Sequence, residues 1–409
     1  MKLGVLKNYY YQFLFLLGVA ITYLDHFELT IAVWSLVFLL TISNYYSVSL
    51  IKLLIPFFVI LLTAFVVMLF YDYQSYFVIR DVTYLTKPII GFLLGYQLYK
   101  KNSKKPFELI LGTALFIASI HICVVVFAFL FQGATNLNLI REYGGYFSDY
   151  EVYALIILLF HEEFGLHFSS KKLKIYIAFI AISVLLYFAR TNFIQLLILF
   201  LALKGYFKIT QKSLTIFVSI LTFCVVGYAT IVVIDPKRNG KGVEAFLYKL
   251  KLVPIEPFKT KINREDYIDF NDNYRSWENI MTIRQVSRDS YWNVFFGKGL
   301  GSQIDLKQKV YLGDMELRFI SILHNGFMIV FLKSGLFGIL IYSYTIYFFF
   351  RKKDDEIPIL KPLKLLFLGT GIFLVFSNWV FLGFYNLIDA KTILLGYLIA
   401  YSEHQKKII

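Results

Sequence analysis

Twelve apolar runs constrain this chain more than any other feature of its sequence. A run of about 20 apolar residues is long enough to cross a bilayer as a helix. Lipid offers the backbone no hydrogen-bond partners, so such runs must form helices or a closed barrel. Barrel strands alternate in polarity, and these runs do not. The runs cover residues 9–24, 28–42, 52–71, 76–98, 107–131, 150–167, 173–188, 191–207, 213–234, 325–350, 363–381 and 384–401.

The composition agrees with a membrane protein. Of the 409 residues, 58% are hydrophobic and 19% aromatic, and a soluble fold of this length has too little interior to bury so much apolar surface. A net charge of +14 would suggest a nucleic-acid partner in a soluble protein, but in a membrane protein basic residues collect in cytoplasmic loops. The sequence therefore predicts an all-α polytopic membrane protein with about 12 transmembrane helices, and no nucleic-acid partner.

The basic residues also predict an orientation. With the N-terminus in the cytoplasm, cytoplasmic segments hold 20 Lys and Arg residues. The short outer segments hold four, namely Arg80, Arg141, Arg190 and Lys391. This alternation matches the positive-inside rule. We therefore expect a multi-pass protein of the cytoplasmic membrane with both termini in the cytoplasm.

One segment between apolar runs is long. Residues 235–323 hold 15 basic and 12 acidic residues, and their place in the alternation puts them outside the cytoplasm. They divide the chain into membrane helices 1–9 (1–234), an extracytoplasmic loop subdomain (235–323) and membrane helices 10–12 (324–409). Within the loop, apolar residues recur at helical spacing between Trp277 and Val286. This spacing predicts an amphipathic helix over residues 273–297, ended by the GKGLGS sequence.

Five arginines are candidates for binding an anion outside the membrane. Arg141 and Arg190 lie at the outer boundary, where they contact headgroups or form an anion site. The planar fork of arginine suits phosphate because it donates two parallel hydrogen bonds. The long loop adds Arg275, Arg284 and Arg288, for which the alternative is a solvated face. Arg284 and Arg288 share a helical face, and Arg275 points elsewhere.

The tenth run begins with a titratable residue. Asn325 is placed to cap that helix through its side-chain oxygen, whereas His324 is either an interfacial residue or a proton acceptor at the outer rim. Gly335 and Gly338 are one turn apart, a spacing that allows close helix packing. Lys333 lies inside the same run, where a charge is costly and faces a cavity or a partner.

The fourth run contains a further polar face. Arg80, Tyr84 and Lys87 follow a helical spacing, so with His121 in the next run they line a polar cavity, unless the two cations extend outward to the interfaces. No metal-ligand cluster or nucleotide-binding pattern stands in a credible context. These residues therefore indicate a site built from arginine and histidine, with no metal and no cofactor.

The spacing around His324 resembles a known family. His324-Asn325, nine residues and then Gly335-x-x-Gly338 resembles the HN-x9-GxxG signature of the O-antigen ligase and O-antigen polymerase superfamily. The stretches REYGGYFSD, FARTNFIQLLILFL, RSWENI and FFGKGLGS resemble its other motifs, in the same order. Arg288, ten residues and then Gly299 also fits an arginine-x10-glycine spacing. Ala189 replaces a common serine, and Lys333 stands where an acidic residue is common.

The resemblance implies a GT-C-like membrane glycosyltransferase with an extracytoplasmic active site. Its donor would be a glycan on undecaprenyl pyrophosphate, and its acceptor a hydroxyl of a second glycan or of a lipid core. His324 would be the catalytic base, supported by Asn325, Gly335 and Gly338. The arginines would bind the pyrophosphate, and Lys333, Lys87 and Arg80 would support the site. Partners would include membrane lipid, a chain-length regulator and a flippase of the same pathway.

Four functions follow from these observations. The first is a polymerase that joins repeat units of O-antigen, capsule or exopolysaccharide. The second is a ligase that transfers finished polymer to a lipid core, since both enzymes carry the motif. The third is a transporter or flippase of lipid-linked sugars, although transporters have related halves and polar residues at midplane. The fourth is a non-catalytic scaffold, in which His324 can be replaced freely.

Overall fold

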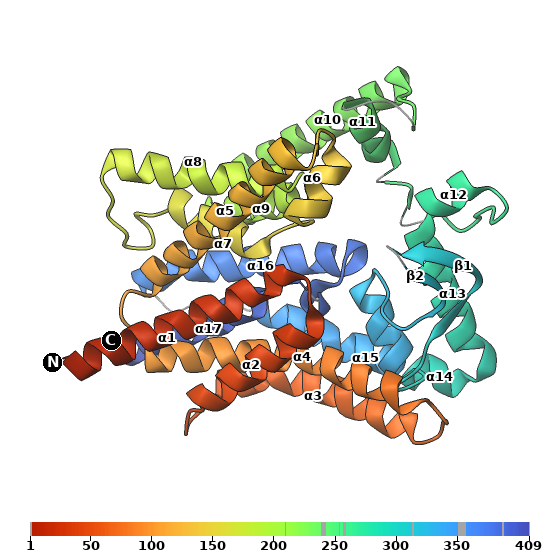
Figure 1. The fold of residues 1–409 in the computed structure, drawn as a ribbon, viewed down its shortest axis with the longest axis horizontal. Helices are drawn as coiled ribbons and strands as arrows, with labels where there is room; N and C mark the ends of the chain where they lie inside the picture. Colours follow the sequence, from red (N-terminus) through yellow and green to blue (C-terminus); the bar gives the residue numbers. More distant parts are fainter. Residues whose placement is uncertain are drawn as a thin grey trace.

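The computed structural model describes residues 2–208, 210–238, 243–252, 254–256, 259–312, 315–350, 357–386 and 388–408. It is predominantly helical, and every apolar run contains a helix (Figure 1). These helices are α1 (Lys2–Ala20), α2 (Phe27–Thr41), α3 (Val48–Met68), α4 (Ser75–Lys101), α5 (Pro106–Phe131), α7 (Asp149–Leu159), α8 (Ser170–Leu186), α9 (Arg190–Leu203), α10 (Gln211–Ile234), α15 (Gly326–Phe350), α16 (Lys361–Val380) and α17 (Lys391–Ile408). Short 3-10 turns η1 (Ile21–Leu24), η3 (Pro358–Leu360) and η4 (Gly383–Tyr385) join some of them.

Among the described residues, five helical segments are long and apolar enough to cross a membrane. They are α3, α5, α10, α15 and the segment Pro358–Val380 that contains α16. The chain is therefore a helical membrane protein by length and composition, while twelve crossings and their orientation stay predictions. Two predicted runs have wrong bounds. α7 ends at Leu159, because a turn follows over residues 160–165, and the last helix begins at Lys391 rather than at residue 384.

The centre of the bundle is held by close helix contacts. α17 packs along α4, and α15 packs along α3. A Cβ atom added to Gly95 of α4 would lie 1.9 Å from the carbonyl oxygen of Ile393 in α17. Small residues allow helix backbones to approach in lipid, where apolar burial adds little between helices. Gly95 therefore fixes how closely α4 and α17 pack.

The segment between α10 and α15 forms a separate region at the end of the molecule opposite the two termini (Figure 1). Its helices are α11 (Val243–Leu252), α12 (Tyr267–Asp272), α13 (Tyr274–Asp289) and α14 (Tyr291–Phe296). The predicted amphipathic helix is thus confirmed as α13 but ends earlier than predicted. Ser290 interrupts it and accepts a hydrogen bond from the Trp292 amide at 3.1 Å, which begins α14.

The prediction of an all-α fold is wrong in this region. β1 (Ile304–Leu312) pairs antiparallel with β2 (Met315–Ile320), with Ile304 opposite Ile320 and an irregularity between Asp305 and Val310. The strands form because apolar residues alternate along them, and Ile304, Leu306, Val310 and Ile320 are buried. The hairpin leads directly into the residues before α15. It therefore helps to position His324.

α15 is not a continuous helix. At Gly335 the backbone has φ 64° and ψ −160°, a conformation open essentially to glycine alone. A Cβ atom there would lie 2.4 Å from the Phe295 backbone at the end of α14. A Cβ atom on Gly338 would meet side chains of its own helix, at Ser334 and Val330. Gly335 therefore allows a close approach of α14, at a break in α15, whereas the atoms nearest to a Cβ on Gly338 belong to its own helix.

The GKGLG sequence is the segment that crosses this break. The amides of Lys298 and Gly299 donate to the carbonyl oxygens of Leu332 and Lys333, at 2.8 and 3.2 Å. The next amide, of Leu300, donates to a carbonyl oxygen of α3 at 3.0 Å. These amides are used within the fold. They are not arranged to bind a phosphate.

Candidate active site

His324 forms a pair with a carboxylate of the segment between α10 and α15. Its Nδ1 lies 3.0 Å from both oxygens of Glu278 on α13, and its backbone amide donates to Glu278 Oε2 at 3.0 Å. A carboxylate accepts hydrogen bonds, so Nδ1 carries a proton, and in the tautomer that this bond favours the lone pair is on Nε2. The side chain of Glu278 is 1% exposed and that of His324 is 38% exposed. Nε2, the ring nitrogen that does not bind Glu278, therefore belongs to the more exposed residue of the pair, His324.

Two neighbours fix this pair in place. The Asn325 side chain accepts from the Met328 amide at 3.1 Å, which confirms the predicted helix cap. The Tyr274 ring meets the His324 ring edge to face, with centroids 5.9 Å apart. Burial raises the pKa of the Tyr274 phenol, and the charge of Glu278 raises it further. Tyr274 therefore stays neutral and acts as a rigid wall beside the imidazole.

Three arginines gather from distant parts of the chain. Arg141 lies on α6 (Leu137–Gly144), Arg190 begins α9 and Arg275 lies on α13, one turn before Glu278. The charges of Arg275 and Arg141 act on Arg190, together with the opposite charge of Glu256. Such like charges repel one another, and an anion between them removes that repulsion. The cluster is therefore suited to a ligand with more than one negative charge.

The surroundings of Arg141 also favour an anion. Burial lowers the pKa of its guanidinium, Tyr146 opposes that shift, and Arg275 adds to it. Its guanidinium lies over the Tyr146 ring, 5.4 Å from the centroid. Arg275 is 4.0 Å from Glu256, a contact at the limit of an ion pair. Glu256 thus acts on Arg275 and on Arg190, and the like charges of the three arginines act on one another.

Arg284 and Arg288 do not join this cluster. Arg284 lines a pocket on another face of α13, and Arg288 is exposed one turn further along. Their placement follows from the helical period, since residues six and ten positions after Glu278 point about 100° away from it. The structure agrees with the expectation that Arg275 points away from Arg284 and Arg288, and it does not bring these two arginines to His324.

Lys333 does not face an open cavity. Its Nζ lies 2.5 Å from Asp81 Oδ2 and 2.5 Å from the Ser302 carbonyl oxygen, and its side chain is 2% exposed. The Gly301 amide donates to the same Asp81 oxygen at 2.7 Å. A charge buried in a bundle needs such a partner. Of the two expected environments, a cavity or a partner, the structure shows a partner, and Lys333 forms a buried ion pair with Asp81.

The predicted cavity of α4 is also wrong. Arg80 donates to Ser321, and its guanidinium lies over the Phe77 ring, 4.9 Å from the centroid. Lys87 is buried and donates to the carbonyl oxygens of Asn386 and Asp389. These two cations thus bind different segments and share no cavity.

The structure places His121 apart from both cations. It stacks on Tyr187 with ring centroids 3.8 Å apart, and its Nδ1 is 2.7 Å from Ser183 Oγ. Both partners belong to the α8 region, whereas Lys87 binds the segment before α17. A helical spacing on α4 shows which residues share a face, but not which helix covers that face.

Sequence reasoning missed the partners of His324, which precedes α15, and of Lys333, which lies within it. Glu278 stands beside Trp277 on the buried face of α13, and a carboxylate on such a face needs a partner. That signal was present in the RSWENI sequence. Asp81 gave no comparable signal, because it lies next to Arg80 and 252 residues before Lys333.

The comparisons with known proteins do not assign the chain to a family. No family model, no curated protein and no solved structure matches it. The chemistry of the candidate site therefore depends on the contacts described above.

Proposed function

We propose that this protein is a membrane glycosyltransferase that polymerises oligosaccharide repeat units carried on undecaprenyl pyrophosphate. The reaction would occur on the outer face of the cytoplasmic membrane, with no metal or other cofactor. The observation that carries the proposal is the His324–Glu278 pair beside the cluster of Arg141, Arg190 and Arg275. A base next to an anion-binding cluster is what transfer from a pyrophosphate requires.

In the proposed reaction, Nε2 of His324 takes the proton of the acceptor hydroxyl. The hydroxyl oxygen then forms a bond to the anomeric carbon of the donor sugar. The bond from that carbon to the pyrophosphate oxygen breaks, and the leaving group keeps the electron pair. The three guanidinium groups stabilise this developing charge, and Glu278 stabilises the imidazolium.

The arrangement of the outer region supports this placement. The termini lie together at one end of the molecule, and α12, α13 and α14 lie at the other (Figure 1). A membrane across the bundle would leave His324 near one surface. The headgroup of a lipid-linked donor lies at such a surface, while its chain stays among the helices.

The first test is a transfer assay with the purified full-length protein in detergent, a lipid-pyrophosphate-linked repeat unit and a chelator. We expect a size ladder from the wild type and a loss of about 10³-fold for His324→Gln, because a positioned base contributes about that factor. His167→Gln is the matched control, since that histidine is exposed. A ladder of equal length from His324→Gln would refute the assigned base.

Two further arms separate the remaining functions. Arg275→Gln should raise KM for the lipid-linked donor about tenfold, the effect of one lost charged hydrogen bond. Transfer that appears only after a lipid-core acceptor is added would identify a ligase. Movement of the donor across vesicles without any transfer would identify a flippase.

A further inference from the structure

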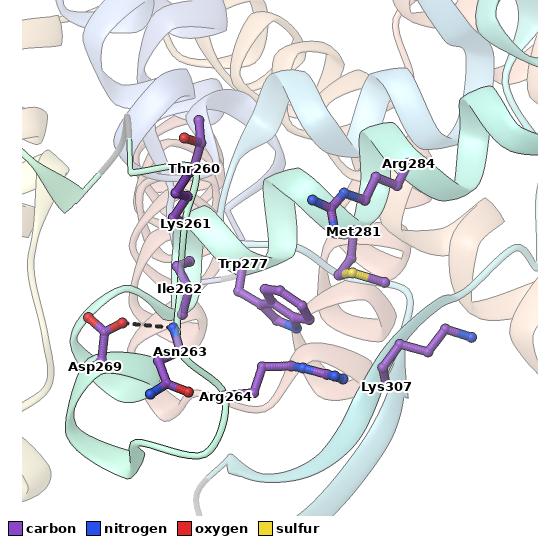
Figure 2. A pocket seen from close by; sticks show the side chains of 10 residues that line it. All are labelled: Thr260, Lys261, Ile262, Asn263, Arg264, Asp269, Trp277, Met281, Arg284 and Lys307. Atoms are coloured by element: carbon purple, nitrogen blue, oxygen red, sulfur yellow. Dashed lines mark hydrogen bonds between the residues drawn. The ribbon is translucent and has the colours of Figure 1, made fainter.

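A second basic site lies on the outer region, on another face of α13. A pocket of about 730 Å³ opens between the segment 260–264, α13 and β1 (Figure 2). Its volume is within the range of pockets that hold small ligands, about 300 to 1,000 Å³. Four cations line it, from three separate segments: Lys261, Arg264, Arg284 and Lys307. None of these residues belongs to the His324 cluster.

Most of the positive charge in this pocket is not neutralised. Among the residues the structure describes, Lys261, Arg264 and Arg284 form no ion pair. Lys307 binds Asp305 at 2.9 Å, and that carboxylate is also held by Arg318. The one acidic residue that lines the pocket, Asp269, is paired with Lys259. The pocket therefore retains at least three charges for an anionic ligand.

The lining also includes three apolar side chains. Trp277 and Met281, one turn apart on α13, form part of the wall, and Ile262 faces them across the pocket (Figure 2). The indole Nε1 donates to the Leu306 carbonyl oxygen at 3.0 Å, which fixes the ring. The Arg264 guanidinium lies over that ring, 5.6 Å from the centroid. A small inorganic anion has no apolar surface that could pack against these side chains.

We propose that this pocket binds an acidic sugar residue of a saccharide substrate, with the carboxylate on Arg284 and Lys261 and the sugar ring against Trp277 and Met281. The choice of a saccharide rests on the proposed function. Arginine can bind a carboxylate through two parallel hydrogen bonds. Aromatic and apolar side chains supply the contact area of ligand pockets. Trp277 and Glu278 are consecutive, so one helix would position both the acidic sugar and the catalytic base.

The test measures binding alone, without a lipid carrier or turnover. The full-length protein in detergent is titrated in a calorimeter with a tetramer of galacturonic acid and with its carboxyl-reduced, neutral counterpart. We expect the acidic tetramer to bind about tenfold more tightly or better, with an affinity that falls as salt is added. Equal binding of the two tetramers would overturn the proposal.

Variants locate the binding site. Arg284→Gln should weaken binding of the acidic tetramer about tenfold, and Arg284→Lys should lose part of that affinity because the fork is lost. Lys309→Gln is the control, since Lys309 has the same charge on β1, lies outside the pocket and pairs with Glu316. Equal losses for Arg284→Gln and Lys309→Gln would overturn the proposal.

A third probe separates a sugar site from a site for any small anion. Inorganic phosphate should bind more weakly than the acidic tetramer, and comparable affinities would overturn the saccharide assignment. Because no turnover is measured, tetramer binding by a protein that shows no transferase activity would uphold this site while the proposed function failed. Absence of binding by an active polymerase would reject only this inference.

Discussion

Two ion pairs that involve residues 324–333 differ in how far their basic side chain is exposed to solvent. We call His324–Glu278 the open pair and Lys333–Asp81 the enclosed pair. His324 pairs with Glu278, and Lys333 pairs with Asp81. Both carboxylates are buried, with side chains 1% and 2% exposed. The basic members differ, because the His324 side chain is 38% exposed and that of Lys333 is 2% exposed.

The comparison shows how a basic residue near a membrane helix can be assigned a role. Lys333 uses its ammonium protons on Asp81 and on the Ser302 carbonyl and hydroxyl oxygens. His324 uses one ring nitrogen on Glu278 and keeps the other for a further group. A basic side chain whose polar atoms are all bound to protein groups stabilises the fold. A basic side chain with one accessible nitrogen can also accept a proton from a ligand.

The largest expected effect is on the enclosed pair. Asp81→Asn should lower the free energy of unfolding by about 3 to 5 kcal/mol, because it leaves the Lys333 charge buried without a counter-charge. Denaturant titration in mixed micelles measures this change. The double variant Asp81→Asn with Lys333→Met should recover much of the loss. A single variant as stable as the wild type would show that this pair does not contribute to the fold.

The open pair should respond in activity instead. Glu278→Gln should lower the transfer rate about 10²-fold, because its amide group donates toward Nδ1 and favours the tautomer with a proton on Nε2. The measurement is the initial rate with a lipid-linked donor, together with its pH profile. Glu265→Gln, on an exposed residue of the same outer region, is the control. An unchanged rate for Glu278→Gln would show that the pair is only structural.

The break in α15 supports the enclosed pair, since the loop that crosses it carries Ser302 to Lys333. Gly335→Ala should destabilise the protein by about 2 kcal/mol, because alanine rarely adopts φ 64° and its Cβ would lie 2.4 Å from Phe295. Thermal unfolding in detergent measures the effect. Gly112→Ala is the control, because nothing lies within 4 Å of its added Cβ. Equal stability of the two variants would contradict the role of the break.

The smallest effect concerns the hairpin that leads to His324. The Arg318 hydrogen bond holds the pKa of Asp305 below its usual range. Because that pKa is depressed in the folded state, the stabilisation exists above the unfolded pKa of about 3.9 and disappears as the pH falls through the folded value. Arg318 is exposed and its ion pair is screened by solvent, so Arg318→Gln should lower stability only slightly at pH 7.

Hydrogen exchange of residues 304–312 and 315–320, measured at pH 7 and at a pH below the folded-state pKa of Asp305, tests this prediction. Exchange in the Arg318→Gln variant should be faster than in the wild type at the higher pH. The two proteins should converge at the lower pH, when Asp305 loses its charge. A difference that grows as the pH falls would contradict the assigned pair.

The helices of the bundle were predictable because lipid imposes one local solution on any long apolar run. The cap at Asn325 was also predictable, because a helix cap depends only on residues that are neighbours in the sequence. The hairpin was missed although its alternation of apolar residues between Ile304 and Ile320 is visible in the sequence. The apolar spacing of the preceding segment led to a helical interpretation of the whole region.

The contacts of the site were less predictable. The resemblance pointed to His324, Arg141, Arg190, Arg275 and Arg288, and the structure brings the first three of these arginines together but not Arg288. It could not identify Glu278 as the partner of His324, because that depends on the rotation of α13 about its axis. Nor does any local pattern connect Lys333 with Asp81, since their pairing depends on how α4 packs beside α15.

The crossing at Gly335 also affects how the protein unfolds. The amides of Lys298 and Gly299 bind carbonyl oxygens of α15 itself. If residues 235–323 were replaced by a short linker, those carbonyl groups would lose their partners within the bundle. The segment between α10 and α15 is therefore part of the cooperative folding unit of the bundle, and exchange at these two amides would report its global opening.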